Sequence, residues 1–217
     1  MVPPIATSDR RGRDGTRTRA RIEEAALRLF AARGVAGTSV REIAEAVGVS
    51  EGALYRHFAS KEELARALFL DRYASLAQSI RDMAQRHTDL SSRLRAVIDF
   101  GCRLFDEEPA LFAYLLISQH DHLAHVPDDC EHNAVAALAE LLAGSVDDGF
   151  ELPQPPAMAA AMALGALVQP AVFALYGRLD GPLSRHAPTI TDGVLRLLRA
   201  PAPRGAERSK DLDNSIG

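Results

Sequence analysis

The sequence predicts an all-helical fold of about nine helices, and three observations support this prediction. Apolar residues make up 47% of the 217 residues, and alanine and leucine, both strong helix formers, dominate among them. Apolar side chains recur at gaps of three and four, as in the series Phe69, Tyr73, Leu76 and Ile80. No stretch of any length alternates apolar with polar residues, as a half-buried strand would.

The two ends of the chain differ in character from its middle. Residues 1–16 are predicted to be a flexible, arginine-rich arm, and residues 201–217 a disordered tail, because few apolar residues occur in either. Residues 1–60 carry ten arginines against seven acidic residues, whereas the rest of the chain is acidic. This asymmetry suggests that only the N-terminal part meets a polyanion.

Cysteine usage and hydropathy favour a cytoplasmic protein that does not enter a membrane. The two cysteines, Cys102 and Cys130, are too few for a disulfide framework. The run 155–177 lacks charge, but it is mostly alanine and contains Gln169 and Pro170. We therefore interpret it as a buried helix rather than as a membrane span.

The N-terminal part is predicted to contain three short helices followed by a long one. A capping box of Ser39 and Glu42 opens the second helix, which Gly48 ends. Ser50 can cap the third helix after only two residues, and a second capping box at Ser60 opens the long helix. The first helix carries the apolar stripe Ile22, Ala25, Ala26, Leu29 and Phe30.

The predicted helices 39–47 and 50–57 form a helix-turn-helix, whose second helix normally lies in the major groove of DNA. Gly52 costs about 1 kcal/mol of helix stability, so we expect a bulky partner to approach closely there. If Leu54 and Phe58 face inward, the outward and flanking positions are Glu51, Gly52, Tyr55 and Arg56.

Three side chains near this helix offer contacts to phosphate oxygens. Tyr55 and His57 are hydrogen-bond donors, and Lys61 adds a positive charge to the free N–H groups at a helix start. Each has a structural alternative: Tyr55 as a packing residue, His57 as a cap of the next helix, and Lys61 as a solvated surface lysine.

The spacing of these residues from Ile22 to Leu64 resembles, without a gap, the TetR family of bacterial transcriptional repressors. The resemblance rests on segments such as Thr38-Ser39-Val40, Gly48-Val49-Ser50 and Lys61-Glu62-Glu63-Leu64. It implies a homodimer, a palindromic operator, and a pocket in the larger domain whose occupation by a small-molecule effector releases double-stranded DNA.

The same resemblance implies individual DNA contacts. Phosphate contacts are implied for Thr38, Ser39, Tyr55, His57 and Lys61, and contacts to base edges or flanking phosphates for Ser50, Glu51, Gly52, Ala53 and Arg56. Glu51 departs from the small or basic residue often found at its place. It could accept a hydrogen bond from a cytosine amino group or point away, so the sequence preference stays open.

A helix-turn-helix domain over 17–62 is therefore expected to precede a ligand-binding and dimerisation domain over 63–200. His120 continues the apolar stripe of Phe112 and Leu116, so it could project a polar group into a pocket. The expected pocket walls are Phe100, Leu104, Phe112, Leu116 and Phe173. Alternatively, this set is plain core.

Small residues every four positions predict a surface where another helix can approach closely. Ala157, Ala161 and Gly165 form this ridge. Together with a second apolar stripe they predict a four-helix dimer interface. The members of that stripe are Ile190, Val194, Leu197 and Leu198.

Other functions were weighed against a ligand-responsive repressor. The segment from His120 to His132 holds four histidines and Cys130, so a zinc- or nickel-responsive repressor is one alternative. Its spacing matches no established motif, and we predict no metal or cofactor. A second alternative is an architectural protein that binds DNA without sequence preference. No phosphate loop, nucleophile elbow or metal-hydrolase pattern occurs, so we expect no enzyme.

Overall fold

The structure is a computed structural model that describes residues 8–144 and 155–198, with side chains from Gly15 on except those of Ile117 and His120. Its described residues form nine α-helices and two 3₁₀ turns and no strand, so the predicted all-helical fold is confirmed. The helices are α1 (Ser8–Arg33), α2 (Val40–Val47), α3 (Glu51–Tyr55), α4 (Lys61–Arg86), α5 (Leu90–Glu107), α6 (Pro109–His122), α7 (Ala134–Ala143), α8 (Pro156–Leu175) and α9 (Ala187–Leu197). The 3₁₀ turns are η1 (Leu123–His125) and η3 (Leu183–His186).

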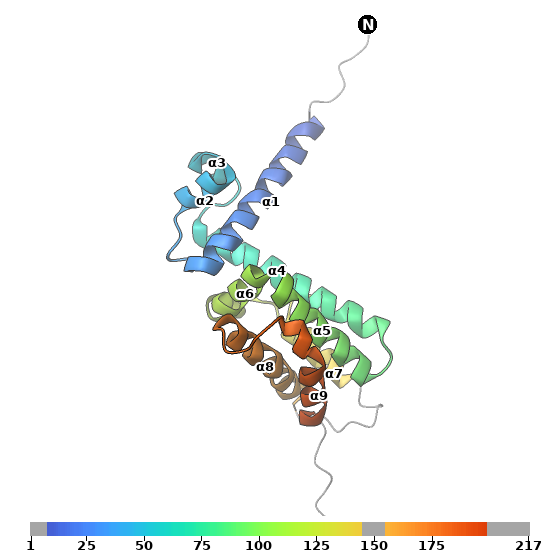
Figure 1. The fold of residues 1–217 in the computed structure, drawn as a ribbon. Helices are drawn as coiled ribbons and strands as arrows, with labels where there is room; N and C mark the ends of the chain where they lie inside the picture. The colour runs from blue at the N-terminus through green and yellow to red at the C-terminus, as the bar shows by residue number, and fades with distance from the viewer. Residues whose placement is uncertain (1–7, 145–154, 199–217) are drawn as a thin grey trace, which may run out of the picture.

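The helices gather into a small head and a larger body (Figure 1). We use "head" for α1, α2, α3 and the first turns of α4, and "body" for the rest of α4 through α9. Each part has its own cluster of buried apolar side chains. Helix α4 belongs to both clusters, and Leu111 and Tyr114 of α6 extend the head cluster. The two parts are therefore joined by shared helices rather than by a loop.

Serine caps and a glycine stop set the helices of the head. The Ser39 hydroxyl accepts a hydrogen bond from the Glu42 backbone N–H at 3.2 Å, and the Glu42 carboxylate accepts one from the Ser39 N–H at 2.8 Å. Gly48 ends α2 with a left-handed φ of 75°, a conformation that glycine adopts without steric cost. The hydroxyls of Ser50 and Ser60 also cap their helices, α3 and α4, by accepting hydrogen bonds from the backbone N–H groups of Ala53 and Glu63.

Two predicted boundaries differ from the structure. Helix α1 begins at Ser8, so the prediction of a flexible arm is wrong for residues 8–16. Arginine is a good helix former, and a helix already nucleated by the apolar stripe can extend through it. The predicted domain boundary after residue 62 falls inside the continuous helix α4. Residues 1–7 and the predicted tail lie outside the described residues.

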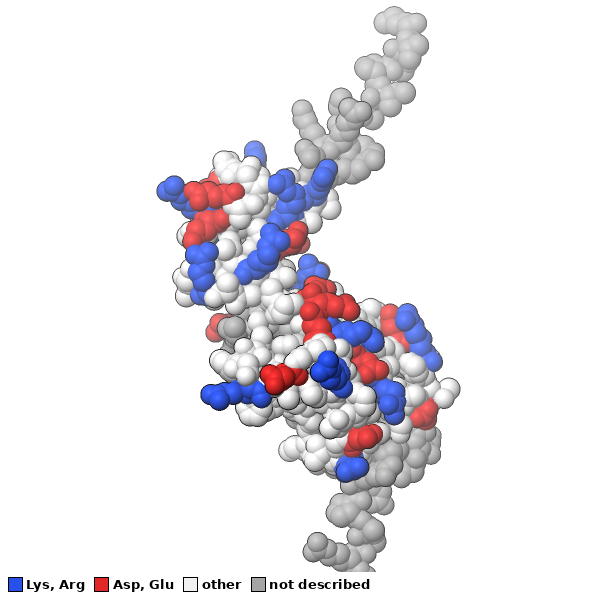
Figure 2. All heavy atoms as spheres, in the orientation of Figure 1, with Lys and Arg blue, Asp and Glu red and all other residues white. Residues whose placement is uncertain are grey.

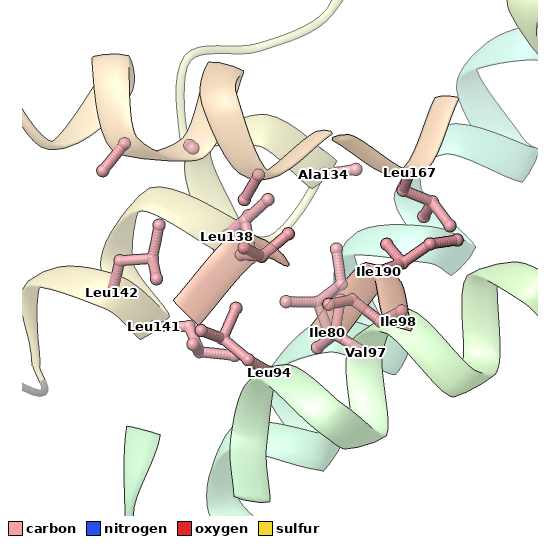
Figure 3. Packing of buried hydrophobic residues seen from close by; sticks show 14 of the residues in the cluster. Ile80, Leu94, Val97, Ile98, Ala134, Leu138, Leu141, Leu142, Leu167 and Ile190 are labelled. Atoms are coloured by element: carbon pink, nitrogen blue, oxygen red, sulfur yellow. The ribbon is translucent and has the colours of Figure 1, made fainter. Parts of the chain in front are cut away.

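The body core brings together side chains from α4, α5, α7, α8 and α9 (Figure 3). Helices α5 and α8 approach closely at Gly101, because a Cβ atom there would lie 2.5 Å from a methyl carbon of Leu167 and that side chain would have to shift. Ile190, Val194 and Leu198 are 8%, 0% and 0% exposed. The prediction that they form a dimer surface is therefore wrong, because α9 turns its apolar stripe toward its own chain.

Candidate DNA interface and ligand pocket

Helix α3 is anchored so that one face is left open. Leu54 and Phe58 are 0% and 2% exposed and belong to the head core. Glu51, Gly52, Tyr55 and Arg56 are consequently exposed, Ala53 and His57 are partly buried, and the Tyr55 ring is 49% exposed. A Cβ atom on Gly52 would meet nothing within 4 Å. Packing inside the chain therefore gives no reason for this glycine, whereas a closely approaching partner would.

Two arginines from α1 hold the helix-turn-helix in place. The Arg21 guanidinium donates a hydrogen bond to the Val47 carbonyl, the last residue of α2. The Arg19 guanidinium lies 4.4 Å from the centre of the Phe58 ring, a favourable cation–π geometry. These contacts orient α2 and α3 against the first helix.

Apart from Arg21, the arginines of the head divide into those that pair with an acidic residue and those that do not, and basic and acidic side chains are interleaved on its surface (Figure 2). Within the described side chains of α1, α2 and α3 and the turn after α3, Arg17 and Arg56 are exposed and have neither a hydrogen bond nor an ion pair. Both are therefore available for phosphate groups. The paired arginines are Arg19 with Glu23, Arg28 with Glu24, Arg33 with Glu42, and Arg41 with Glu45.

Arg17 was not singled out from the sequence, although a signal for it exists. Four residues before and after it stand Arg13 and Arg21, so an acidic residue is offered to it only at the i, i+3 spacing, by Asp14. The same test applied to Arg56 finds Gly52 and Ser60. This spacing is a weak signal, because Arg33 also lacks an acidic residue four positions away and yet pairs with Glu42, nine positions along the chain.

Two of the expected phosphate contacts are engaged inside the chain. The Thr38 side chain is 2% exposed, and its hydroxyl donates to the Gly34 carbonyl at 2.9 Å. The Lys61 ammonium donates to the Thr38 carbonyl at 2.8 Å, and its side chain is 18% exposed. These two side chains fasten the start of α4 to the start of α2. The Thr38 hydroxyl is withdrawn from solvent, whereas the Lys61 ammonium keeps two further N–H donors for the predicted phosphate contact.

The body contains an apolar cavity of about 160 Å³ between α4, α5, α6, α7 and α8. Four of the expected wall residues line it: Phe100, Leu104, Phe112 and Leu116. Phe173 does not, because it points outward from α8 and is 52% exposed. The side chain of His120 lies outside the described residues. Sequence reasoning missed Tyr73 and Gln119, the two lining residues with polar side-chain groups.

The histidine-rich segment does not assemble a metal site among the described side chains, where no three His, Cys, Asp or Glu groups converge. His132 shares a 2.8 Å hydrogen bond with Asp129. His122 packs against the Phe69 ring at 5.3 Å, and burial lowers the pKa of its imidazole. His122 and His132 are therefore engaged in packing and hydrogen bonding within the chain.

The geometry is that of a helix-turn-helix DNA-binding protein with a cavity in its larger part. Residues 22–68 match the family model of bacterial regulatory proteins of the tetR family. The chain is 32% identical over 152 residues to the transcriptional repressor AcnR of Corynebacterium diphtheriae, an alignment that covers 61% of this chain and 78% of AcnR. The chain therefore belongs to the TetR family of transcriptional regulators, which are not enzymes.

Two further comparisons extend this result. The chain is 30% identical over 132 residues to the repressor KstR2 of Rhodococcus jostii; the match covers 61% of this chain and spans 58% of KstR2. A crystal structure of FadR from Bacillus subtilis in complex with stearoyl-CoA superposes with a TM-score of 0.66 at 17% identity, covering 81% of this chain and 96% of FadR. This second match shows a common fold over head and body.

Proposed function

We propose that this protein is a cytoplasmic, ligand-responsive repressor that binds a palindromic operator as a homodimer and leaves it when an apolar effector fills the body cavity. One observation carries the proposal: the cavity lies against α4 and α6, and the same two helices pack into the head. A ligand that moves either helix changes the position of the DNA-binding surface. Such a ligand lowers DNA affinity by linkage, because it prefers one head position and DNA prefers another.

The DNA contacts follow from the exposed side chains of the head. Helix α3 enters the major groove, and Glu51, Gly52 and Ala53 approach base edges. Arg56 and Arg17 meet phosphates, and their support is that both are exposed and unpaired. Ser39, Ser50, Tyr55 and His57 complete the phosphate contacts on the same face.

The dimer is proposed to form through the outer face of α8. Ala157, Ala161 and Gly165 are exposed there in one row, which lets a second helix approach closely. Apolar side chains flank this row, and a contiguous apolar patch on a soluble protein marks an interface. The exposed members on α8 and at its end are Met158, Leu164, Phe173, Leu175 and Tyr176, and Leu197 of α9 is exposed as well.

A lipid bilayer is the alternative to a second copy of the chain as the partner that covers the outer face of α8. Among the described helices, α8 is long and apolar enough to span a bilayer by length and composition. Its opposite side contributes Ala159, Ala160 and Leu167 to the body core, so a lipid-embedded α8 would have to leave that core. A second copy of the chain covers the outer face without disrupting the inner one, and a two-fold pairing uses the same patch on both chains.

The effector is proposed to have a long apolar body and few polar groups. The cavity walls are apolar, and Gln119 and Tyr73 are the lining residues that carry polar side-chain groups. The cavity of about 160 Å³ is smaller than the roughly 300–1,000 Å³ of most small-molecule sites. An acyl chain therefore enters only if the walls move apart. Stearoyl-CoA, the ligand of the FadR complex, is the first probe to test.

The test is selection of bound duplexes from a random DNA library at near-physiological salt, with Tyr55→Ala as the loss variant and Arg28→Ala as the surface control. We expect enrichment of one inverted repeat, lost in Tyr55→Ala and kept in Arg28→Ala. Salt-sensitive binding without enrichment would instead identify an architectural DNA binder. Stearoyl-CoA, zinc and nickel are then added to the operator complex, and release by a metal alone would favour the metal-responsive alternative.

A further inference from the structure

Four aromatic rings join the cavity wall to the first helix of the head. Tyr73, which lines the cavity, stacks on Phe69 with ring centres 5.3 Å apart and planes at 15°. Phe69 meets Tyr114 edge-on at 6.5 Å, and Tyr114 stacks on Phe30 at 6.0 Å. We call Tyr73, Phe69, Tyr114 and Phe30 the aromatic chain. It connects the cavity, α4, α6 and α1 by direct ring contacts.

The inner rings of the aromatic chain have little freedom to move independently. Phe69 and Tyr114 are 0% exposed and Phe30 is 1% exposed. The Tyr114 hydroxyl donates a hydrogen bond to the Ala65 carbonyl at 2.6 Å, which fixes α6 to α4 one turn before Phe69. Close-packed interiors have low compressibility, so a displaced ring shifts its neighbour instead of compressing the space between them.

Tyr73 is the end of the aromatic chain at which a ligand in the cavity can act. Its ring packs against both the body core and the head core. On α6, Phe112 and Leu116 line the cavity, while Tyr114 belongs to the head core. A ligand that needs more room than the cavity offers therefore pushes on Tyr73 and on the cavity face of α6 together.

We propose that the aromatic chain is the coupling element through which a filled cavity moves α1 relative to α4 and so disables the head for DNA binding. The proposal rests on the ligand-responsive function proposed above and deepens it by naming the positioning residues. Phe69 is the central one, because it touches Tyr73, Tyr114 and the His122 ring and lines neither the cavity nor the proposed DNA surface.

A second ring pair supplies a matched control. Phe105 of α5 meets Phe112 edge-on at 5.3 Å, so it also stands behind a wall residue of the cavity without lining it. Phe105 packs against the body core and has no ring contact to the head. Phe105→Leu thus removes a ring behind the cavity, as Phe69→Leu does, but leaves the aromatic chain intact.

The first experiment measures operator affinity with and without saturating stearoyl-CoA, together with direct binding of stearoyl-CoA, in the full chain. Allosteric ligands typically change affinity by about 5- to 150-fold, and we expect a factor in this range for the wild type and for Phe105→Leu. In Phe69→Leu the factor should fall to within about twofold, while stearoyl-CoA still binds. If folded Phe69→Leu shows the same change in operator affinity on addition of stearoyl-CoA as the wild type, the proposal is overturned.

The second experiment needs no effector. Ala163 of α8 lines the cavity and is 6% exposed, so Ala163→Phe fills the cavity from a helix that contributes no residue to the head core. We expect this variant to weaken operator binding by about fivefold or more, and Phe69→Leu in the same chain to restore it. The aromatic chain is refuted if Ala163→Phe is folded and dimeric yet leaves operator affinity unchanged, or if the double variant binds as weakly as the single one.

The two experiments separate failure of the aromatic chain from failure of the proposed effector. If stearoyl-CoA has no effect on the wild type, the effector assignment fails and the cavity-filling variants decide the coupling. If Phe69→Leu does not fold, as judged by its melting temperature, Tyr73→Leu takes its place. Tyr73→Leu is expected to uncouple Ala163→Phe from operator binding, whereas Tyr73→Phe, which keeps the ring, is expected to retain the coupling; equal behaviour of the two variants would overturn the proposal.

Discussion

The head and the body are both helical, but different interactions define their helices. In the head, α2, α3 and α4 each begin at a serine whose hydroxyl accepts a backbone hydrogen bond. In the body, α5 and α7 also begin at a side-chain cap, from Asp89 and Asn133, but α6, α8 and α9 begin at a proline-containing turn without one. Local polar caps therefore specify α2, α3 and α4 of the head but only part of the body, where burial of apolar side chains has the larger share.

This difference explains how much sequence each part shares with its relatives. A cap needs a particular residue at a particular place, so the head pattern is recognisable over residues 22–68. Apolar packing tolerates many substitutions if volume and pattern are kept. The fold of the body can accordingly be shared with FadR at 17% identity over most of the chain.

The largest expected effect tests whether the head core is packed more tightly than the body. Leu54→Ala removes a fully buried side chain and should lower the free energy of unfolding by about 2–5 kcal/mol. Leu116→Ala should cost less, because Leu116 already faces an empty cavity. Urea unfolding of both variants makes the comparison, and an equal loss would contradict it.

A smaller effect tests the unpaired arginines of the head. Arg56→Ala should weaken operator binding by about 1–3 kcal/mol and lower the salt slope by about 1. Arg17→Ala is expected to act in the same direction. Arg28→Ala serves as the control, since its guanidinium is 2.7 Å from the Glu24 carboxylate. Fluorescence anisotropy over a salt series measures all three, and an unchanged slope for Arg56→Ala would remove it from the interface.

The serine caps provide the next test of the local rules. Ser50→Ala removes the acceptor for the Ala53 N–H and should cost about 0.5–2 kcal/mol. Ser75→Ala is the matched control, because the Ser75 hydroxyl bonds to the Asp71 carbonyl inside α4 and caps no helix. Thermal unfolding should show a lower Tm for Ser50→Ala alone, and equal Tm changes would argue against a special role of caps in the head.

The smallest effect concerns a polar contact of the body. The Asp106 carboxylate accepts hydrogen bonds from the N–H groups of Leu183 and Ser184 at 2.7 and 3.0 Å, tying α5 to η3. Burial alone would raise the pKa of Asp106, but the hydrogen bond from the Ser184 side chain and those from the backbone N–H groups of Ser184 and Leu183 outweigh it, so the pKa is lowered. The resulting stability is present above the unfolded-state pKa of about 3.9 and is lost as the pH falls through the folded-state value.

Asp106→Asn tests this contact. Near neutral pH the variant should be less stable than the wild type. When the pH falls below about 4, the variant should lose less additional stability than the wild type does. Asp192→Asn, on the exposed side of α9, is the control. Unfolding curves over a pH series measure the difference. If the free energy of unfolding falls equally steeply at acid pH in the wild type and in Asp106→Asn, the contact is excluded as a source of stability.

The starts of the head helices could be predicted from the sequence because capping is local. Ser39 and Ser60 were recognised from the glutamate three residues later, and both caps are present. The periodicity of α9 predicted its apolar face correctly, but it could not predict whether that face is covered by the same chain or by a second copy. Ile190 and Val194 are covered by the chain itself.

Contacts between distant segments were also beyond the sequence. The Lys61 hydrogen bond to Thr38 spans 23 positions, and the Tyr114 hydrogen bond to Ala65 spans 49. No local pattern predicts either pair. The first explains why Lys61 is not a free cation, and the second is part of the link between cavity and head.

Helix α4 sets a rule for exchanging heads between regulators. Because it continues unbroken from Lys61 to Arg86, a foreign head grafted onto this body must be joined inside a helix. Each residue added at the junction turns the head by about 100° and advances it by about 1.5 Å. A chimera that is one residue too long would therefore aim its recognition helix away from the operator even if both halves folded perfectly.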